Sequence, residues 1–321
     1  MYRANAAGAR LVRVRTSRTS EPSDVQSRLS CAAALRLVYW MRLACPMSTA
    51  YTIAHCSDIH FGKIAHAEVV PALVNDINAH DVDLVAVSGD LTQRARTGEF
   101  QAAVAMIERF EAPTLVVPGN HDVYPWWHPW KRLWAPLQKY QQLVQHELRP
   151  THVTPEVAVL GLSSPHGATV KSGRLRPEAL NTMQAFFDQH ASRFRVLVVH
   201  HHLTRMEQLG RHDIMGNADE ALTAAAQTQV DLILCGHLHI SHIESVDVVS
   251  DRGDTEHGMV VASAGTATSS RGRKSNRGVN FYNLVHIRPD SFSVEERRYQ
   301  PDATAFSEVR TTSFDRATSL S

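Results

Sequence analysis

The sequence predicts a layered α/β domain, with β-sheets inside and helices outside. Short apolar runs alternate with longer segments whose apolar residues recur at helical spacing. In the last third, apolar runs follow one another across short loops, which indicates antiparallel strands. Five of the predicted strands end in Asp, Asn or His, and ligands of such folds bind beyond the carboxyl ends of the strands.

Strands are expected where a short apolar run is bounded by turn residues, and helices where apolar residues recur every three or four positions. The helix after the first strand, for example, has Val69, Val70, Leu73, Val74 and Ile77 on one face. In chain order, the predicted strands are 51–56, 84–87, 114–117, 157–162, 196–199, 231–234, 259–263, 281–287 and 292–299. The predicted helices between them are 69–77, 99–110, 177–190 and 217–228.

Composition is that of an ordinary globular protein, with 43% hydrophobic and 20% charged residues in 321. No apolar run approaches the roughly 20 residues of a membrane span. The net charge of +1 gives no global field that would attract nucleic acid or a membrane. The four cysteines show no paired spacing and two lie in predicted strands, so we expect free thiols and a cytoplasmic location.

The chain divides into an extension at 1–47, one domain at 48–300 and a polar tail at 301–321 that we expect to fray. The extension has eight Arg and no Lys against two acidic residues. An Arg-rich, acid-poor composition fits a transit peptide. A secretory signal is disfavoured, because Arg36 and Arg42 interrupt the apolar stretch. We favour a third interpretation, in which the start codon is assigned too early and Met47 begins the protein.

Side chains that bind metal or move protons follow five predicted strands. Together they bring three oxygen and four nitrogen ligands, which are Asp58, His60, Asp90, Asn120, His200, His237 and His239. Imidazole mixed with carboxylate and amide oxygen suits zinc, manganese or iron, and not calcium or magnesium alone. Seven ligands exceed one tetrahedral site and predict two metals with a bridging carboxylate. The pairs Asp58/His60 and His237/His239 would each point the same way in an extended chain.

Five short motifs occur in a fixed order along residues 51–287. They are Asp58-x-His60, Gly89-Asp90, Gly119-Asn120-His121-Asp122, His200 at a strand end, and Gly236-His237-x-His239. In this order they resemble the calcineurin-like metallophosphoesterase superfamily; the joint pattern is specific, although each motif alone is weak. Within that superfamily the chain is most similar to bacterial phosphodiesterases of the cyclic-nucleotide type, with 91–96 and 264–268 as supporting segments.

The resemblance implies a four-layer αββα sandwich of mixed sheets, with the metal site at the C-terminal ends of the strands. It implies one metal held by Asp58, His60 and His239, a second held by Asn120, His200 and His237, and Asp90 as the bridge. His121 would face the substrate phosphate and serve as the acid, and Asp122 would orient its ring. Family members often have His-His-Pro where this chain has three histidines and Leu203. Strand register makes His200 the ligand; His201 would line the pocket, and His202 has no assigned role.

The implied activity is hydrolysis of a small phosphodiester, a 3′,5′-cyclic nucleotide being the leading candidate, by attack of a metal-bridging hydroxide. The implied cofactors are two divalent or mixed-valence ions of iron, manganese or zinc. The alternatives are hydrolysis of a glycerophosphodiester or of a nucleotide-lipid pyrophosphate and, in another class, a non-catalytic interaction scaffold. The complete ligand set and His121 favour the enzyme. We expect no stable nucleic-acid partner; the sequence does not indicate how many chains associate.

Two further segments stay open between a structural and a functional interpretation. Trp126, Trp127, Trp130 and Trp134 recur at helical spacing. We favour an amphipathic helix packed on the domain; the alternatives are a lid beside the site and a membrane-surface helix. A basic loop contains Arg271, Arg273, Lys274 and Arg277. It fits either a solvated loop or a contact with phosphate or a polyanion.

Overall fold

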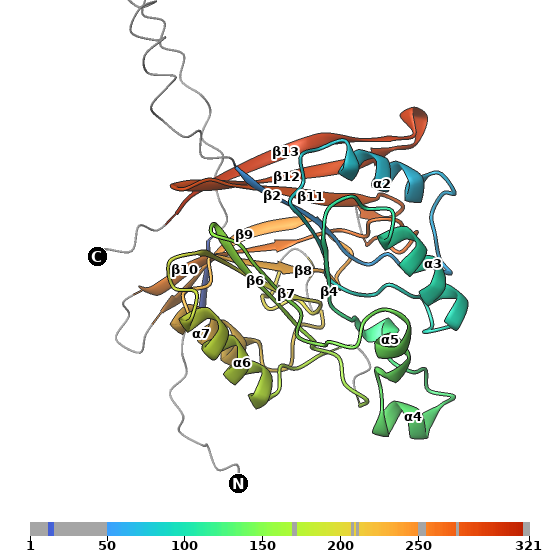
Figure 1. The fold of residues 1–321 in the computed structure, drawn as a ribbon, viewed down its shortest axis with the longest axis horizontal. Helices are drawn as coiled ribbons and strands as arrows, with labels where there is room; N and C mark the ends of the chain where they lie inside the picture. Colours follow the sequence, from blue (N-terminus) through green and yellow to red (C-terminus); the bar gives the residue numbers. More distant parts are fainter. Residues whose placement is uncertain are drawn as a thin grey trace, which may run out of the picture.

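The protein folds into two mixed β-sheets that face each other, with helices on their outer faces (Figure 1). The computed structural model describes residues 12–15, 50–168, 172–206, 209, 212–249, 255–273 and 276–316. This arrangement confirms the expected α/β class and its four layers. No helix within these ranges is both long and apolar enough to cross a bilayer.

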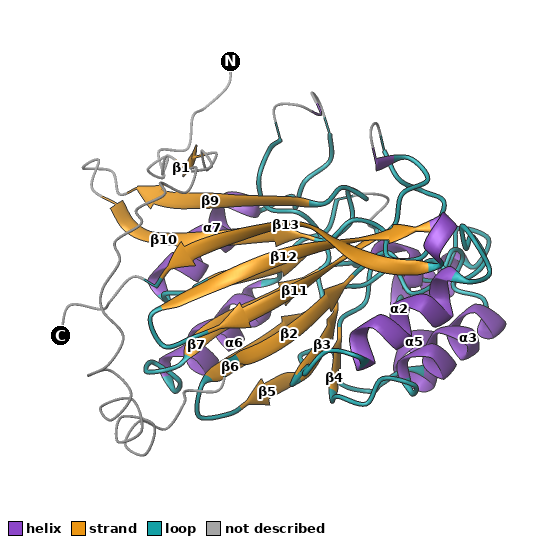
Figure 2. Ribbon diagram, turned by 90° about the horizontal axis from the view of Figure 1, so that it is seen from above, coloured by secondary structure: helices purple, strands orange, loops and turns teal. Residues whose placement is uncertain are grey.

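The first sheet has six strands in the order β13-β12-β11-β2-β3-β4. Its parallel part is β2 (Tyr51–Cys56), β3 (Leu84–Val87) and β4 (Thr114–Val116), and its antiparallel part is β11 (Phe281–Ile287), β12 (Ser291–Gln300) and β13 (Ala305–Asp315). The helices on this side are α2 (Val69–Asn78), α3 (Thr97–Ile107) and α5 (Gln138–Leu143). Figure 2 shows the strands of this sheet from above.

The second sheet has seven strands in the order β1-β9-β10-β8-β7-β6-β5. Their bounds are β1 (Val12–Arg15), β9 (His242–Val249), β10 (Thr255–Ser263), β8 (Leu232–Cys235), β7 (Phe194–Val199), β6 (Val157–Leu162) and β5 (Thr151–Val153). The four central strands β10, β8, β7 and β6 run parallel. Helices α6 (Pro177–Asp188) and α7 (Ala218–Gln227) cover the outer face.

Strands that are buried on both faces explain why the sequence shows short, continuous apolar runs. In β3, Leu84 faces the second sheet whereas Val85 faces the helices. Cys56 and Cys235 are buried free thiols in the two sheet–helix layers, as expected for small core residues. The loops after β2, β3 and β4 of one sheet meet those after β7 and β8 of the other, and this meeting point builds the site.

Several boundary predictions are wrong. The supposed polar tail contains β13, which pairs along its length with β12 and buries Phe306 and part of Phe314 while its polar side chains face solvent. Within the excluded extension, β1 pairs with β9, so the exclusion fails for those four residues; the other residues of 1–47 lie outside the described ranges. Strands β5 and β9 were not expected. Strand β10 lies beside β8 in the second sheet, and not in a hairpin with β11.

The tryptophan segment is not one packed amphipathic helix. Prolines at 125, 129 and 136 interrupt it. The result is two short helices, α4 (Pro129–Trp134) and α5, of which α4 lies at the periphery of the molecule (Figure 1). Tyr140 and Leu137 of the second part are buried, whereas all four tryptophans are exposed.

Candidate metal centre

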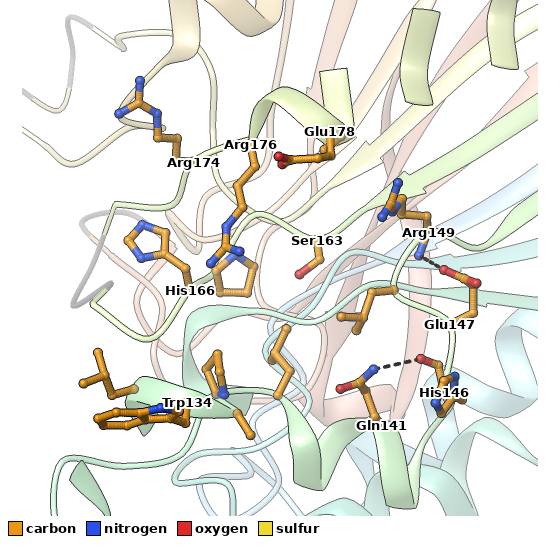
Figure 3. Close-up of a pocket in the computed structure, with 17 residues that line it drawn as sticks. Trp134, Gln141, His146, Glu147, Arg149, Ser163, His166, Arg174, Arg176 and Glu178 are labelled. Atoms are coloured by element: carbon orange, nitrogen blue, oxygen red, sulfur yellow. Dashed lines mark hydrogen bonds between the residues drawn. The ribbon is translucent and has the colours of Figure 1, made fainter. Parts of the chain in front are cut away.

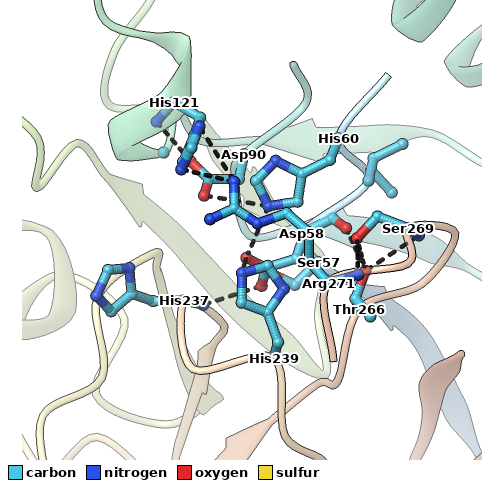
Figure 4. Close-up of polar contacts among 12 residues, drawn as sticks. Ser57, Asp58, His60, Asp90, His121, His237, His239, Thr266, Ser269 and Arg271 are labelled. Carbon is cyan, nitrogen blue, oxygen red and sulfur yellow. Dashed lines mark hydrogen bonds and ion pairs between the residues drawn. The ribbon is translucent and has the colours of Figure 1, made fainter. Parts of the chain in front are cut away.

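Three oxygen atoms each lie between two imidazole nitrogens. Asp58 Oδ1 is 3.6 Å from His60 Nε2 and 3.5 Å from His239 Nε2. Asn120 Oδ1 is 3.2 Å from His200 Nε2 and 3.0 Å from His237 Nδ1. Asp90 Oδ2 is 3.5 Å from His60 Nε2 and 3.4 Å from His200 Nε2, so one atom adjoins both groups. The structure thus brings all seven predicted ligands together, with Asp90 shared between the two groups that the resemblance implies. A ring nitrogen of His201 also lies within 4.8 Å of ring nitrogens of His200 and His237. Figure 4 shows Asp58, His60, Asp90, His237 and His239 around the centre.

The spacing of the donor atoms is that of ligands around a shared metal ion. Ligand atoms about 2.0–2.2 Å from a shared ion lie roughly 3 to 3.6 Å apart, as these do. Asp58 Oδ1 and His60 Nε2 are buried and have no hydrogen-bond partner within the described part of the chain. A buried carboxylate oxygen and imidazole nitrogen without partners would be costly unless an ion satisfies them.

The atoms that face away from the centre are held by the surrounding chain. His60 Nδ1 lies 3.1 Å from the Thr92 carbonyl oxygen, and His200 Nδ1 lies 2.8 Å from that of Ser88. Asp58 Oδ2 accepts hydrogen bonds from Ser57 Oγ at 2.8 Å and from the His237 backbone N–H at 2.9 Å. Such outer contacts orient ligand rings and carboxylates toward a metal.

Five of the ligands have left-handed backbone, a region that glycine adopts most easily and that Asp, Asn and His enter more often than other residues. Their φ angles lie between 51° and 72°, and they are Asp58, His60, Asp90, His237 and His239. Asp58 and His60 therefore converge through tight left-handed turns, as do His237 and His239. We expected each pair to converge, but through an extended chain. Gly119 permits a further close approach, because a Cβ there would lie 2.1 Å from Asp90 Oδ1.

Burial and neighbouring charges shift the pKa values of the ligands in different directions. Burial acts to lower the pKa of His200, but the Asp90 and Asp58 carboxylates raise it to about 9. Burial alone would raise the pKa of Asp90, but His200 and His121 hold it well below its ordinary value. Burial lowers the pKa of His237 to about 3, so this imidazole is neutral. A deprotonated carboxylate and a neutral imidazole are the forms that bind divalent ions.

His121 lies beside the centre, as expected, but Asp122 does not orient its ring. His121 Nδ1 is 2.8 Å from the Gln93 carbonyl oxygen. The Asp122 carboxylate instead accepts backbone N–H bonds from Leu91, Thr92 and Gly119 at 2.9 to 3.1 Å. It ties the loop after β3 to the loop after β4, and its burial, with the charge of Asp90, raises its pKa to about 6. The motif alone suggested a catalytic role for Asp122, because the sequence does not show which hydrogen-bond donors surround its carboxylate.

Arg271 is the functional neighbour that sequence reasoning left undecided. Its Nη1 donates to His121 Nε2 at 2.9 Å and to Gln93 Oε1 at 3.2 Å (Figure 4). In this arrangement the His121 proton is on Nδ1. Burial lowers the pKa of His121, and the charge of Arg271 contributes to the same shift. A cation and an imidazole nitrogen thus face the same space beside the ligands.

The two extra histidines after β7 differ in their surroundings. The His201 ring lies 4.7 Å from that of His237, and its Nδ1 is 2.7 Å from Ser164 Oγ. Ser163 and His166, on either side of Ser164, line a cavity of about 810 Å³ (Figure 3). His202 turns away instead, toward Thr204 N–H at 3.2 Å, and burial lowers its pKa to about 4.

Comparison with known proteins agrees with this centre. The family model for "Calcineurin-like phosphoesterase" matches residues 51–241. A Haemophilus influenzae protein described as 3′,5′-cyclic adenosine monophosphate phosphodiesterase is 28% identical over 179 residues, which cover 55% of this chain and 61% of that protein. Its Escherichia coli K12 counterpart is 28% identical over 163 residues, 50% of this chain and 55% of that protein. The chain thus matches under two thirds of either relative's length.

A third relative and two solved structures extend the comparison. A glycerophosphodiester phosphodiesterase of Enterobacter lignolyticus is 36% identical over 80 residues, 22% of this chain and 29% of that protein. A purple acid phosphatase from yellow lupin superposes with a TM-score of 0.59 at 12% identity, covering 85% of this chain and 55% of that one. The Plasmodium protein GAP50 gives 0.53 at 10% identity, with 83% and 89% covered. At these identities the structures support the fold alone.

Proposed function

Because the chain belongs to the calcineurin-like phosphoesterase family, we propose that it is a two-metal hydrolase of a small phosphodiester. A 3′,5′-cyclic nucleotide is the leading substrate class, supported by the two bacterial relatives described as cyclic AMP phosphodiesterases. The observation that carries the two-metal part is the position of Asp90 Oδ2 between His60 Nε2 and His200 Nε2. A carboxylate oxygen placed this way can belong to both ligand groups at once.

The proposed roles follow from the position of each side chain. Asp58, His60 and His239 would hold one ion, Asn120, His200 and His237 would hold the other, and Asp90 would bind both. When bound, two such ions lower the pKa of water and neutralise charge on a phosphoryl group. The Arg271 guanidinium, and His121 once it is protonated on Nε2, would contact the phosphate oxygens or the leaving oxygen.

Hydrolysis of a glycerophosphodiester is the second candidate, favoured by the 36% identical segment shared with the Enterobacter lignolyticus enzyme. A scaffold without activity is disfavoured. A protein that only binds partners has no need of unpartnered buried ligand atoms or left-handed backbone at five ligand positions.

The proposal is tested with protein loaded with Mn²⁺, Zn²⁺ or Fe²⁺ and assayed on bis(p-nitrophenyl) phosphate. We expect turnover that disappears after chelation and returns with metal. A panel of cyclic nucleotides, glycerophosphodiesters and nucleotide-linked pyrophosphates then compares kcat/KM values and identifies the substrate class. Turnover of the model diester by none of the metal-loaded forms, with metal content verified, would favour the scaffold.

Arg271→Met should raise KM and lower kcat for a diester, because the side chain brings a permanent cation to the phosphate side of the centre. We expect kcat/KM to fall by about a hundredfold, the scale for loss of one charge-stabilising donor. Arg271→Lys should restore only part of the loss, since ammonium lacks the planar fork. Arg273→Met, an exposed change two residues away, is the matched control. Equal effects at both positions would show that only the general charge of the loop matters.

A further inference from the structure

A cluster of five large apolar side chains stands exposed on and just before α4. We name it the tryptophan face: Trp126, Trp127, Trp130, Leu133 and Trp134, which are 56 to 73% exposed. These residues make up most of the large exposed apolar side chains in the described part of the chain. Exposed apolar clusters of this kind mark interaction sites.

The face is held in place by specific contacts and is not a loose loop. The Arg132 side chain is buried, donates to the Tyr124 carbonyl oxygen, and lies 4.2 Å from the ring centre of Trp126. Trp130 and Trp134 pack against each other with ring centres 5.4 Å apart. The structure therefore orders the surface while leaving its outer side uncovered.

The charged side chains beside the indole rings are cationic. No Asp or Glu occurs between residues 123 and 146. Lys131 is exposed between the tryptophans of α4, and the Arg94 guanidinium lies 6.0 Å from the ring centre of Trp127. Tryptophan combined with Lys and Arg is typical of segments that lie at the interface of an anionic bilayer.

We propose that the tryptophan face docks on an anionic phospholipid surface. Its indole rings would enter the headgroup region, while Lys131 and Arg94 would meet lipid phosphates. A second copy of the chain fits less well, because a two-fold interface through this face would bring the same cations of both chains together. Anionic lipid headgroups would instead neutralise the cations on this face.

Docking would also bring the cavity of about 810 Å³ to the lipid surface, because Leu133 and Trp134 belong both to the tryptophan face and to the cavity lining. Arg149, Arg174 and Arg176 line the same cavity together with Glu147 and Glu178 (Figure 3). The tryptophan face is thus continuous with a cavity whose lining includes three arginines and two glutamates. The docking itself does not depend on the proposed hydrolysis. It rests on exposed surface residues, and vesicle binding measures it without any assay of activity.

Vesicle binding of the full chain tests the proposal. The probes are vesicles of phosphatidylcholine alone and of phosphatidylcholine mixed with phosphatidylglycerol. Four of the five tryptophans in the chain belong to the face, so intrinsic fluorescence reports it directly. We expect co-flotation with the anionic vesicles, a blue shift of tryptophan emission, quenching by brominated lipid, and weakening with added salt.

Variants separate the contributions of apolar surface and charge. Trp130→Ser combined with Trp134→Ser should weaken partitioning at least about tenfold, and Lys131→Glu should weaken it about fivefold to tenfold. Val309→Ser changes another exposed apolar residue, which lies on β13, and should leave binding unchanged. Thermal unfolding of each variant shows that the fold is kept.

Three results would overturn the proposal. The first is an absence of any blue shift or flotation with anionic vesicles. The second is equal binding to both vesicle types, which would remove the charge argument. The third is a chain that dimerises in sedimentation, loses dimerisation with Trp130→Ser, and ignores vesicles. In that case a second copy, not lipid, covers the face.

Discussion

Asp90→Ala should be the most damaging single change to the centre. Asp90 Oδ2 lies within 3.5 Å of imidazole nitrogens from both ligand groups. Its loss removes a shared ligand, so we expect both metal affinities to fall by more than the roughly 10–100-fold typical of losing an outer-shell partner. Metal content after dialysis and kcat on bis(p-nitrophenyl) phosphate measure the effect.

His239→Ala is the matched comparison, because His239 adjoins Asp58 and belongs to one ligand group. It should weaken one metal and keep the other. An Asp90→Ala protein that retains two metals per chain would contradict the bridging role. So would a His239→Ala protein that loses both metals as readily as Asp90→Ala does.

His121→Ala should keep both metals and lose activity, because both ring nitrogens contact residues other than the predicted ligands, Nδ1 the Gln93 carbonyl oxygen and Nε2 the Arg271 guanidinium. We expect kcat to fall by about 10²–10⁴ for a poor leaving group, the usual range for a general acid. With p-nitrophenolate, which needs little protonation, the loss should shrink. An equal loss for both leaving groups would assign His121 to charge stabilisation and not to proton transfer.

Asp122→Ala distinguishes support of the loops from chemistry in the same motif. It removes the acceptor of three buried backbone N–H groups, and each such group left unsatisfied costs about 1–3 kcal/mol. We therefore expect a marked drop in thermal stability. An unchanged melting temperature with lost activity would return Asp122 to the catalytic role that the sequence suggested.

The sequence predicted what periodicity and motif order express. Short apolar runs predicted the central strands, which the structure buries on both faces. Asp, Asn and His after five of these runs predicted the ligands. Prediction from the sequence failed where the same type of residue can serve two structural purposes. Strand β13 is polar because it lies at a sheet edge, and its pairing with β12 is long-range. Likewise Asp122 binds backbone instead of an imidazole, a choice made by loops brought together from distant segments.

The tryptophans show the same limit in another form. Their spacing resembles a packed helix, but prolines at 125, 129 and 136 divide the segment, and only the later part is buried. In the sequence, Arg271 is one of several basic residues in a predicted loop. What singles it out is a 2.9 Å contact with His121, about 150 positions away in sequence.

The left-handed ligand positions have a consequence for how this protein can change. At Asp58, His60, Asp90, His237 and His239 the backbone favours glycine, while the chemistry demands a side chain. Stability and function therefore make opposite demands at the same positions. Selection for heat resistance alone would favour relaxing these turns and would erase the ligands, so thermal robustness has to be gained elsewhere in the fold.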